Sequence, residues 1–279
     1  EHHRLDIVTE SLNFAEFQTS VLNKNDFLLS VASTQYKHNH DKEYDPCILF
    51  ETYLGTDMDA SKNQLIEYPI KVLRDILSSG LVKGETLIET LIATSSFMHM
   101  LVAADYFDNI IMLHSCESCE QEAQKWLNKE QEAIDHSHLT TCVCGLKGEC
   151  TTCEDHEEKT TTANKQVVRW NITKENPLDD VVLPQADYVL SFAYLDLVSK
   201  DHEMYLKLLK QISSLVKIGG HLIMLGALNE TYYMLGQHKF STLAYDEQFV
   251  RKALAKNGFI IERFGKEKSR YNSGLCDYE

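Results

Sequence analysis

An alternation of strand-like and helix-like runs after Gly84 constrains the fold of this chain more than any other feature. The strand-like runs are short and apolar, and runs of about ten residues or more with helical spacing of apolar residues separate them. Crossover helices between parallel strands produce this order, and they cover both faces of the sheet. Strands are predicted at residues 86–92, 109–113, 139–143, 166–172, 187–193, 221–225 and 259–264, and helices at 95–106, 116–128, 202–216 and 246–257. The sequence therefore predicts an α/β fold with a doubly wound, mostly parallel sheet.

The remaining segments predict an arm, a cap and one excursion. Residues 1–43 are polar, with only short apolar patches, and are predicted to be an N-terminal arm without a core of its own. Residues 44–279 form the predicted domain, and residues 44–80 are its N-terminal helical cap. The polar segment 145–165 lacks an apolar period and is predicted to be an exposed, cysteine-containing excursion between two strands.

Composition and charge exclude two classes of partner. With 279 residues, of which 43% are hydrophobic, the chain can bury a large core. Its formal net charge of −15 argues against a nucleic acid, since phosphates require a concentrated positive surface. No apolar run approaches the roughly 20 residues that cross a bilayer. We therefore expect neither a nucleic acid nor a membrane as partner.

Longer motifs are more specific than these patterns. They read LPQADYVLSFAYLDL and LLKQISSLVKIGGHLIMLGALNETYYMLGQHKFSTL, preceded by YDPCILFETYLG, LVKGETLIE, QKWLNKEQEAID and VCGLKG. Over residues 44–275 or so, the chain resembles the nicotinamide, phenylethanolamine and indolethylamine N-methyltransferase family, whose members use S-adenosylmethionine to methylate small amines. The resemblance implies a seven-stranded methyltransferase sheet with an N-terminal lid.

The first predicted strand departs from the family where the resemblance implies a cofactor crevice. In the family this strand ends in an acidic residue, and a glycine-rich turn follows that lies against the cofactor. Glu89 keeps the acid, but Ala93, Thr94 and Ser95 replace residues of the turn. Each replacement adds a side chain where the backbone has to approach the ligand.

The resemblance implies further departures at the ends of later strands. Leu113 or His114 stands in place of the aspartate that holds the ribose, and Cys144-Gly145 replaces a Cys-Asp pair near the adenine. Gly226 stands where the family has an aspartate that orients the amine. If each lost polar partner costs about 1–3 kcal/mol, four or five of them remove most of the roughly 8 kcal/mol of a micromolar ligand. We therefore expect a degenerate site that binds no cofactor.

Aromatic side chains surround the site that binds the amine in the resembled family. Phe192, Tyr194, Tyr232 and Tyr233 stand on these stretches, with Asp196 beside them. Aromatic walls with one carboxylate suit a small apolar or cationic ligand. The same rings could equally fill the cavity as core.

Six of the eight cysteines lie close together in the sequence. They form three pairs, Cys116 with Cys119, Cys142 with Cys144, and Cys150 with Cys153. Two CxxC pairs can supply a tetrahedral zinc site, whereas in a secreted protein the same cysteines would form disulfides. Glycosylation sequons at Asn171 and Asn229, and a first residue that is not methionine, favour secretion, with a cytoplasmic location as the alternative.

Three functions follow from these features. The favoured one is a secreted, non-catalytic protein with a methyltransferase fold that carries or stores a small ligand or has a structural role. The second is an active S-adenosylmethionine-dependent N-methyltransferase, in which Asp196, Tyr232 and Tyr233 position a small amine. The third is a metal-binding protein that uses the cysteines and histidines.

Overall fold

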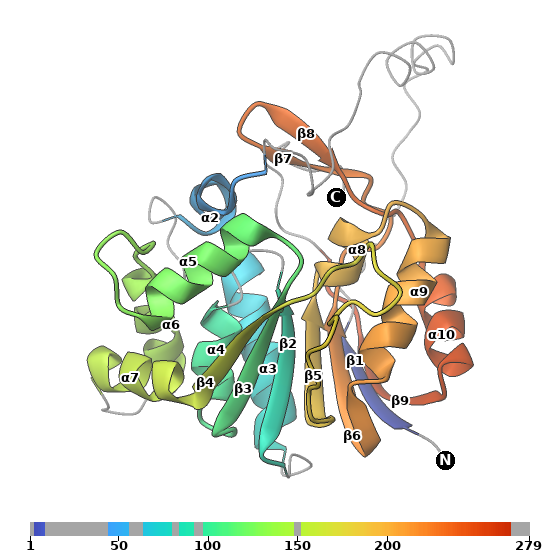
Figure 1. Ribbon diagram of the computed structural model, residues 1–279, viewed down its shortest axis with the longest axis horizontal. Coiled ribbons are helices and arrows are strands. Elements are labelled where there is room, and N and C mark those ends of the chain that lie inside the picture. The colour runs from blue at the N-terminus through green and yellow to red at the C-terminus, as the bar shows by residue number, and fades with distance from the viewer. Residues whose placement is uncertain are drawn as a thin grey trace.

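A parallel sheet forms the centre of the molecule (Figure 1). The computed structural model describes residues 3–8, 44–55, 64–79, 84–91, 97–147 and 152–268. In the order in which they pair, the strands are β4 (Asn164–Arg169), β3 (Asn109–His114), β2 (Thr86–Leu91), β5 (Ala186–Phe192), β6 (Val216–Leu225), β1 (His3–Val8) and β9 (Phe259–Gly265). All of their pairings are parallel. The predicted α/β fold with a mostly parallel sheet is confirmed.

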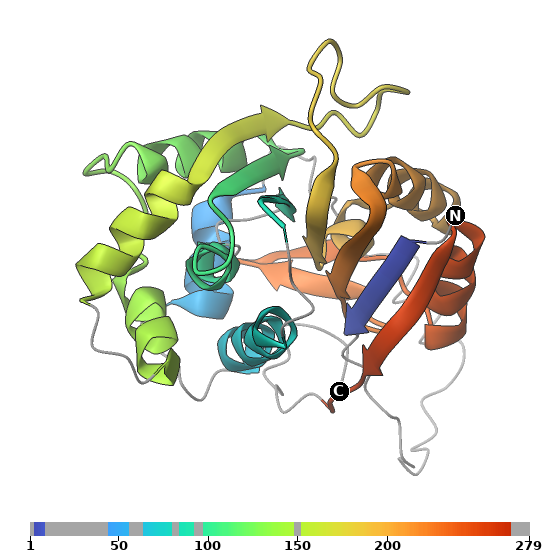
Figure 2. The ribbon, with the colours of Figure 1, turned by 90° about the horizontal axis from the view of Figure 1, so that it is seen from below.

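Helices cover both faces of this sheet, as Figure 2 shows. One face carries α5 (Glu117–Leu127), α8 (Tyr194–Val198), α9 (His202–Ser213) and α10 (Glu247–Lys256), and the other carries α3 (Gln64–Ser78), α4 (Phe97–Ala103), α6 (Ser137–Lys147) and α7 (Cys153–Ala163). Successive residues of a strand face opposite sides. In β3, Ile111 and Leu113 therefore join one buried cluster while Ile110 and Met112 join the other.

A short helix and a hairpin lie over the carboxyl ends of the strands (Figure 1). The helix is α2 (Pro46–Leu54), and the hairpin consists of β7 (Tyr232–Leu235) and β8 (His238–Ser241), which pair antiparallel. The Tyr53 hydroxyl donates to the Met234 carbonyl at 2.9 Å and accepts from the Met234 N–H at 3.1 Å. These two hydrogen bonds tie the cap to the hairpin.

The predicted strand at residues 139–143 is wrong, because this segment lies inside α6. Leu139 and Val143 are four residues apart, so one side of a helix buries both of them against the cluster that contains α4. A five-residue apolar run does not distinguish a strand from a buried helical turn. Much of the predicted excursion at 145–165 is also helical, since α7 occupies residues 153–163.

The seventh strand comes from the segment predicted to be an arm. Residues 3–8 form β1, which pairs with β6 on one side and β9 on the other. The pairing joins segments that are more than two hundred residues apart in the sequence, with Arg4 opposite His221 and Ile260. The division of the chain at residue 43 stays a prediction.

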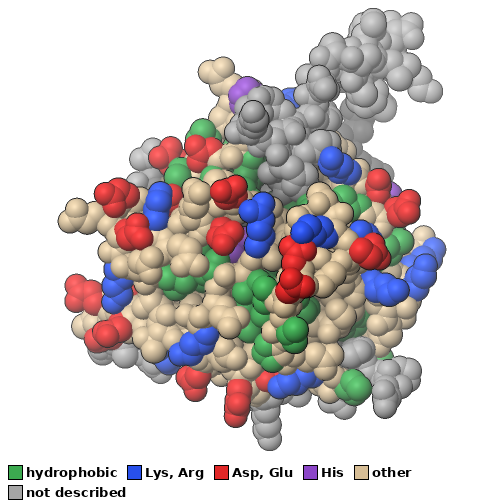
Figure 3. Space-filling model, in the orientation of Figure 1, with side chains coloured by type: hydrophobic (Ala, Val, Ile, Leu, Met, Phe, Trp, Pro, Cys, Tyr) green, Lys and Arg blue, Asp and Glu red, His purple; other side chains and the backbone are tan. Residues whose placement is uncertain are grey.

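The surface charge and the lengths of the helices concern the two classes of partner that the sequence excludes, nucleic acids and membranes. On the face shown in Figure 3, acidic and basic side chains are interspersed. The absence of a nucleic-acid partner stays a prediction. Among the helices that the structure describes, none has the length and apolar character that crossing a membrane requires.

Candidate functional site

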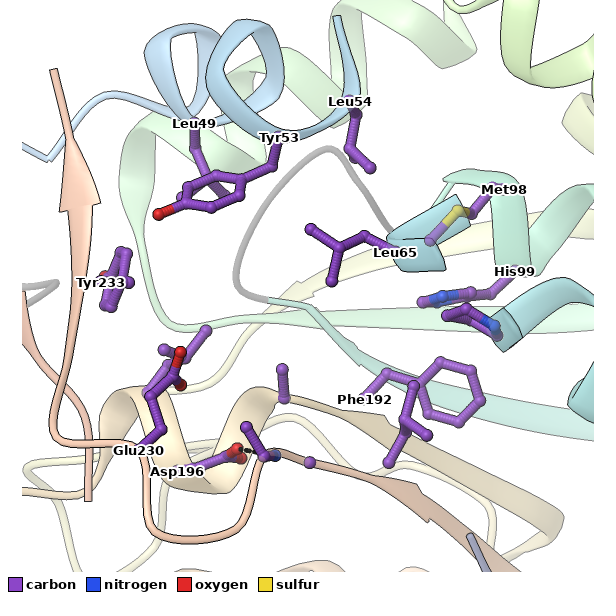
Figure 4. A pocket seen from close by; sticks show the side chains of 16 residues that line it. Leu49, Tyr53, Leu54, Leu65, Met98, His99, Phe192, Asp196, Glu230 and Tyr233 are labelled. Carbon is purple, nitrogen blue, oxygen red and sulfur yellow. Dashed lines mark hydrogen bonds between the residues drawn. The ribbon is translucent and has the colours of Figure 1, made fainter. Parts of the chain in front are cut away.

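A cavity of about 190 Å³ lies at the carboxyl ends of β5 and β6, beneath α2 (Figure 4). Ligands of open α/β sheets bind at this edge because the loops that follow the strands diverge there. Phe192 ends β5 and Ala193 follows it, Leu225 ends β6 and Gly226 follows it, and Tyr53 comes from α2. The sequence segments that build the cavity are therefore far apart and are brought together by the sheet topology.

One end of the cavity is acidic (Figure 4). Asp196 on α8 is 3% exposed and Glu230 is 6% exposed, and both line the cavity. The Oδ2 atom of Asp196 accepts a hydrogen bond from the Ala227 N–H at 3.3 Å, and the Tyr245 hydroxyl also hydrogen-bonds to this carboxyl group. Burial raises the pKa of Asp196 to about 6, so its carboxylate predominates at pH 7.

The opposite end combines apolar side chains with one histidine. His99 on α4 packs its ring edge against Phe192, with ring centroids 4.3 Å apart, and both residues line the cavity. Its Nδ1 atom lies 2.8 Å from Oε1 of the fully buried Glu89, while Nε2 has no hydrogen-bond partner among the described residues. Glu89 is therefore placed behind His99 and does not line the cavity itself.

The end of β3 retains a polar side chain, although the sequence predicted that the group holding the ribose is lost there. Leu113 is completely buried in the core, but His114 is a hydrogen-bonding side chain that is 1% exposed. Both of its ring nitrogens lack a partner among the described residues, and burial lowers its pKa to about 4, so the ring is neutral at pH 7. A neutral imidazole offers one donor and one acceptor, which suits a hydroxyl group.

The two residues predicted near the adenine do not lie at the end of a strand. Cys144 and Gly145 lie in α6 and do not follow a strand, so their assignment is wrong. The residues that follow the edge strand β4 are Trp170 and Asn171. Asn171 is half-buried, and its Oδ1 accepts hydrogen bonds from the N–H and hydroxyl of Thr173. Ala93, Thr94 and Ser95, which were predicted to form the turn after the first strand, lie outside the described residues.

These observations fit a nucleoside such as that of S-adenosylmethionine. A buried polar atom without a partner costs about 1–3 kcal/mol. His99 and His114 carry three such nitrogens between them at the carboxyl edge of the sheet. Ribose hydroxyls are groups that would satisfy them. The expectation of a degenerate site considered the lost carboxylate at this edge of the sheet. It did not consider the imidazole groups of His99 and His114, which also lie there.

The predicted aromatic lining is divided between the cavity and the core. Phe192 and Tyr233 line the cavity together with Asp196, whereas Tyr194 is fully buried in the core. Tyr232 is half-buried, with Lys239 Nζ 4.2 Å from the centre of its ring, and does not line the cavity. Sequence reasoning missed Tyr53, His99 and Glu230, although Tyr53 belongs to the motif YDPCILFETYLG and Glu230 to the block LGALNETYYMLG.

The cysteines do not form the predicted cluster. Cys116 and Cys119 lie at the start of α5, Cys142 and Cys144 in α6, and Cys153 at the start of α7, while Cys150 lies outside the described residues. No disulfide joins the described cysteines, and no group of three or more metal-ligating side chains occurs among the residues that the structure describes. The predicted disulfides and zinc site therefore find no support there. Of the two sequons, Asn229 is exposed.

The chain is similar to known N-methyltransferases over most of its length. The model of the NNMT/PNMT/TEMT family matches residues 32–279. Nicotinamide N-methyltransferase of Homo sapiens is 33% identical over 246 residues, covering 88% of this chain and 91% of its own. Indolethylamine N-methyltransferase of Mus musculus is 28% identical, covering 86% and 91%, and phenylethanolamine N-methyltransferase of Sus scrofa is 29% identical, covering 70% and 69%. A solved O-methyltransferase family protein from Burkholderia thailandensis aligns with 90% of this chain and 65% of its own, at 10% identity and a TM-score of 0.46.

These matches correct the favoured function. The expectation of a non-catalytic protein that needs no cofactor is contradicted, since the chain matches N-methyltransferases over most of its length. The expectation added up the binding free energy lost with each polar group that is missing from the sequence motifs. Such a sum omits the polar side chains that other segments contribute in three dimensions, and it included Gly145, which lies in a helix.

Proposed function

We propose that this chain, which belongs to the NNMT/PNMT/TEMT family, is an S-adenosylmethionine-dependent N-methyltransferase that acts on small amines. The observation that carries the proposal is the buried carboxylate of Asp196 at one end of a mostly apolar cavity. A cationic amine is the ligand that offsets the cost of burying this charge. The aromatic rings of Tyr53, Phe192 and Tyr233 suit the apolar part of such a molecule.

The residues for the cofactor are those at the carboxyl ends of β2, β3 and β4. His114 offers hydrogen bonds to ribose hydroxyls, and His99 is held by Glu89 so that its Nε2 remains available at the cavity. Asn171 follows β4 with an amide side chain that suits a nucleobase edge. When bound, S-adenosylmethionine supplies a methyl group on a positively charged sulfur.

The acidic end and the cap have separate tasks in this reaction. The Asp196 carboxylate binds the amine in its cationic form and accepts its proton, which leaves a lone pair on the nitrogen directed toward the middle of the cavity. Glu230 adds a second acidic group on the same side. Tyr53 holds α2 against the hairpin, and this cap excludes water from the bound amine. Alignment and desolvation of the nucleophile are the main needs of methyl transfer.

The pH dependence of methyl transfer follows from Asp196. Below a pH of about 6 its carboxyl group is neutral and binds a cation weakly, so kcat/KM for an amine should rise as the pH increases through about 6. The measurement is kcat/KM between pH 5 and 8. A Glu230→Gln variant should keep the inflection, and a flat profile for the wild type would contradict the assignment.

Removal of the Tyr53 hydroxyl should loosen the cap. Tyr53→Phe loses two hydrogen bonds to the backbone of Met234, together worth roughly 1–2 kcal/mol, so KM for the amine should rise about 5- to 30-fold with little change in kcat. Steady-state kinetics measures this split. Tyr106→Phe, at an exposed tyrosine outside the cavity lining, should leave both constants unchanged. A fall in kcat at constant KM would count against a positioning role.

The proposed function is tested by two measurements on the full chain. Methyl transfer from labelled S-adenosylmethionine to a panel of primary, secondary and aromatic amines should give at least one methylated product. Calorimetric titration with S-adenosylhomocysteine should give saturable binding in the micromolar range. A blank panel together with no binding of either nucleoside would refute the proposal.

A further inference from the structure

Cys116 and Cys119 stand at the start of α5, directly beyond the end of β3. Cys116 is the N-cap residue of the helix, and Cys119 lies one turn later on the same side. The Cys119 thiol hydrogen-bonds to the sulfur of Cys116, and the Ser118 hydroxyl lies 2.9 Å from that sulfur. The two sulfur atoms are therefore already neighbours in the reduced protein.

The two thiols differ in access. Cys116 is half-buried, so part of the residue faces solvent. Cys119 is 2% exposed, and its thiol also hydrogen-bonds with the hydroxyl of Tyr44, itself a buried residue. One thiol is thus placed to react with an external molecule, and the other stands behind it.

The surroundings of Cys116 stabilise its thiolate. Hydrogen bonds from the Cys119 thiol and the Ser118 hydroxyl, with the nearby N–H groups of both residues, lower the pKa of Cys116 to about 6, although burial opposes this shift. Two acidic residues of the first helical turn, Glu117 and Glu120, also oppose it. Its hydrogen bond to Cys116 and its burial raise the pKa of Cys119, so this residue keeps its proton.

We propose that Cys116 and Cys119 form a thiol–disulfide exchange site that reacts with low-molecular-weight disulfides such as glutathione disulfide. The Cys116 thiolate attacks one sulfur of the disulfide, breaks its S–S bond and releases the first thiolate. That thiolate takes the proton of Cys119. The Cys119 sulfur then attacks Cys116 in the mixed disulfide and displaces the second thiolate.

The reaction is balanced without another reagent. Two electrons pass from the cysteine pair to the external disulfide, which leaves as one thiol and one thiolate, and the protein gains one S–S bond. The thiolate takes up a proton from water, which replaces the proton that Cys116 released when its own thiolate formed. Neighbours three residues apart on a helix have Cβ atoms about 5–6 Å apart, and a disulfide needs roughly 3.5–4.5 Å. The N-cap residue has extended backbone angles, φ −120° and ψ 129°. Its carbonyl accepts the first helical hydrogen bond, from the Glu120 N–H at 3.1 Å, so the shift has to come from its side chain and from the backbone before it.

Cys47 provides a matched control within the same protein. It is half-buried like Cys116 and lies in the first turn of α2. Burial and the neighbouring Glu122 raise its pKa to about 11, so its thiolate is scarce at neutral pH. Because Cys47 and Cys116 are both half-buried, a difference in their reactivity reports the hydrogen bonds around Cys116 at the start of α5 and not its exposure alone.

The first test needs no substitution. The reduced full-length protein is alkylated with iodoacetamide at pH 7, and peptide mass spectrometry follows the rate at each cysteine. Cys116 should react at least about tenfold faster than Cys47. Equal rates at the two residues would overturn the proposal.

The second test uses glutathione disulfide and intact mass. The wild type should lose the mass of two hydrogens with no adduct, and peptide mapping should place the bond between Cys116 and Cys119. Cys119→Ser should trap one glutathione adduct at residue 116, Cys116→Ser should form neither product at this pair, and Cys47→Ser should behave as the wild type. A wild-type bond between other cysteines, or a Cys119→Ser protein without the adduct, would refute the exchange site, whatever the methyl-transfer activity.

Discussion

Replacement of Asp196 by asparagine is expected to lower kcat/KM for amines by about 30- to 1,000-fold, which corresponds to roughly 2–4 kcal/mol. Asparagine has nearly the same shape and keeps one acceptor oxygen for the Ala227 N–H, but it cannot carry the charge that holds a cationic amine. Initial rates at pH 7 measure the loss. A variant with more than a third of the wild-type kcat/KM would contradict the role given to this carboxylate.

The same substitution should not destabilise the protein at pH 7. Because burial raises the pKa of Asp196 from 3.8 to about 6, the folded state binds more protons than the unfolded state between these values. The free energy of unfolding therefore falls as the pH rises from about 4 to 6, by roughly 2–3 kcal/mol, and stays lower above pH 6. Asparagine does not ionise and avoids this cost.

Thermal unfolding at two pH values separates lost function from lost structure. Asp196→Asn should melt several degrees above the wild type at pH 7, and the difference should shrink at pH 4, where the wild-type carboxyl group is neutral. Asp180→Asn, at an exposed aspartate outside the cavity lining, should change neither the Tm nor the activity. A lower Tm for Asp196→Asn at pH 7 would show that its inactivity reports misfolding.

The fold was predictable where a strand is buried on both faces. The apolar runs at 109–113 and 221–225 became β3 and the end of β6, since their continuous hydrophobicity reflects helices above and below. The short run at 139–143 was ambiguous because Leu139 and Val143 fit either a strand or a helical turn. β1 could not be foreseen, because its partners are set by long-range pairing and leave no mark on the local pattern.

The site was predictable only in part for a related reason. Phe192 and Asp196 are four residues apart in one continuous motif, so the sequence alone predicted that they belong to the same site. His99 and Tyr53 reach the same cavity from α4 and α2, and only the folded sheet brings these helices to one edge. The loss of the cofactor was wrongly predicted because the sum of missing groups contained no such side chains from distant segments.

Gly226 places no side chain at a position where the resemblance implies an aspartate, and its surroundings show why none fits. A Cβ at this position would overlap the hydroxyl oxygen of Tyr245 and lie 3.0 Å from Oδ2 of Asp196. The carboxylate of Asp196, hydrogen-bonded by Tyr245, therefore occupies the space that a side chain from position 226 would enter. An acidic group stays at this end of the cavity but comes from a different element, α8.

Gly226→Ala is consequently expected to lower the free energy of unfolding by about 1–3 kcal/mol and to reduce kcat/KM at least about tenfold, since the methyl group forces Tyr245 and Asp196 apart. Tyr245→Phe alone should cost about 1 kcal/mol for the lost hydrogen bond. In the double variant the hydroxyl is absent and the methyl group has room, so the two changes should cost less than their sum by roughly 1–2 kcal/mol.

Denaturant unfolding and amine kinetics of the two single variants and the double variant measure this coupling. Gly145→Ala is the matched control, because a Cβ at this helical position meets nothing within 4 Å, and alanine should be neutral or stabilise by up to about 1 kcal/mol. Strict additivity of Gly226→Ala and Tyr245→Phe would contradict the steric explanation. Coupling without recovery of kcat/KM would mean that the Tyr245 hydroxyl itself orients the Asp196 carboxylate toward the amine.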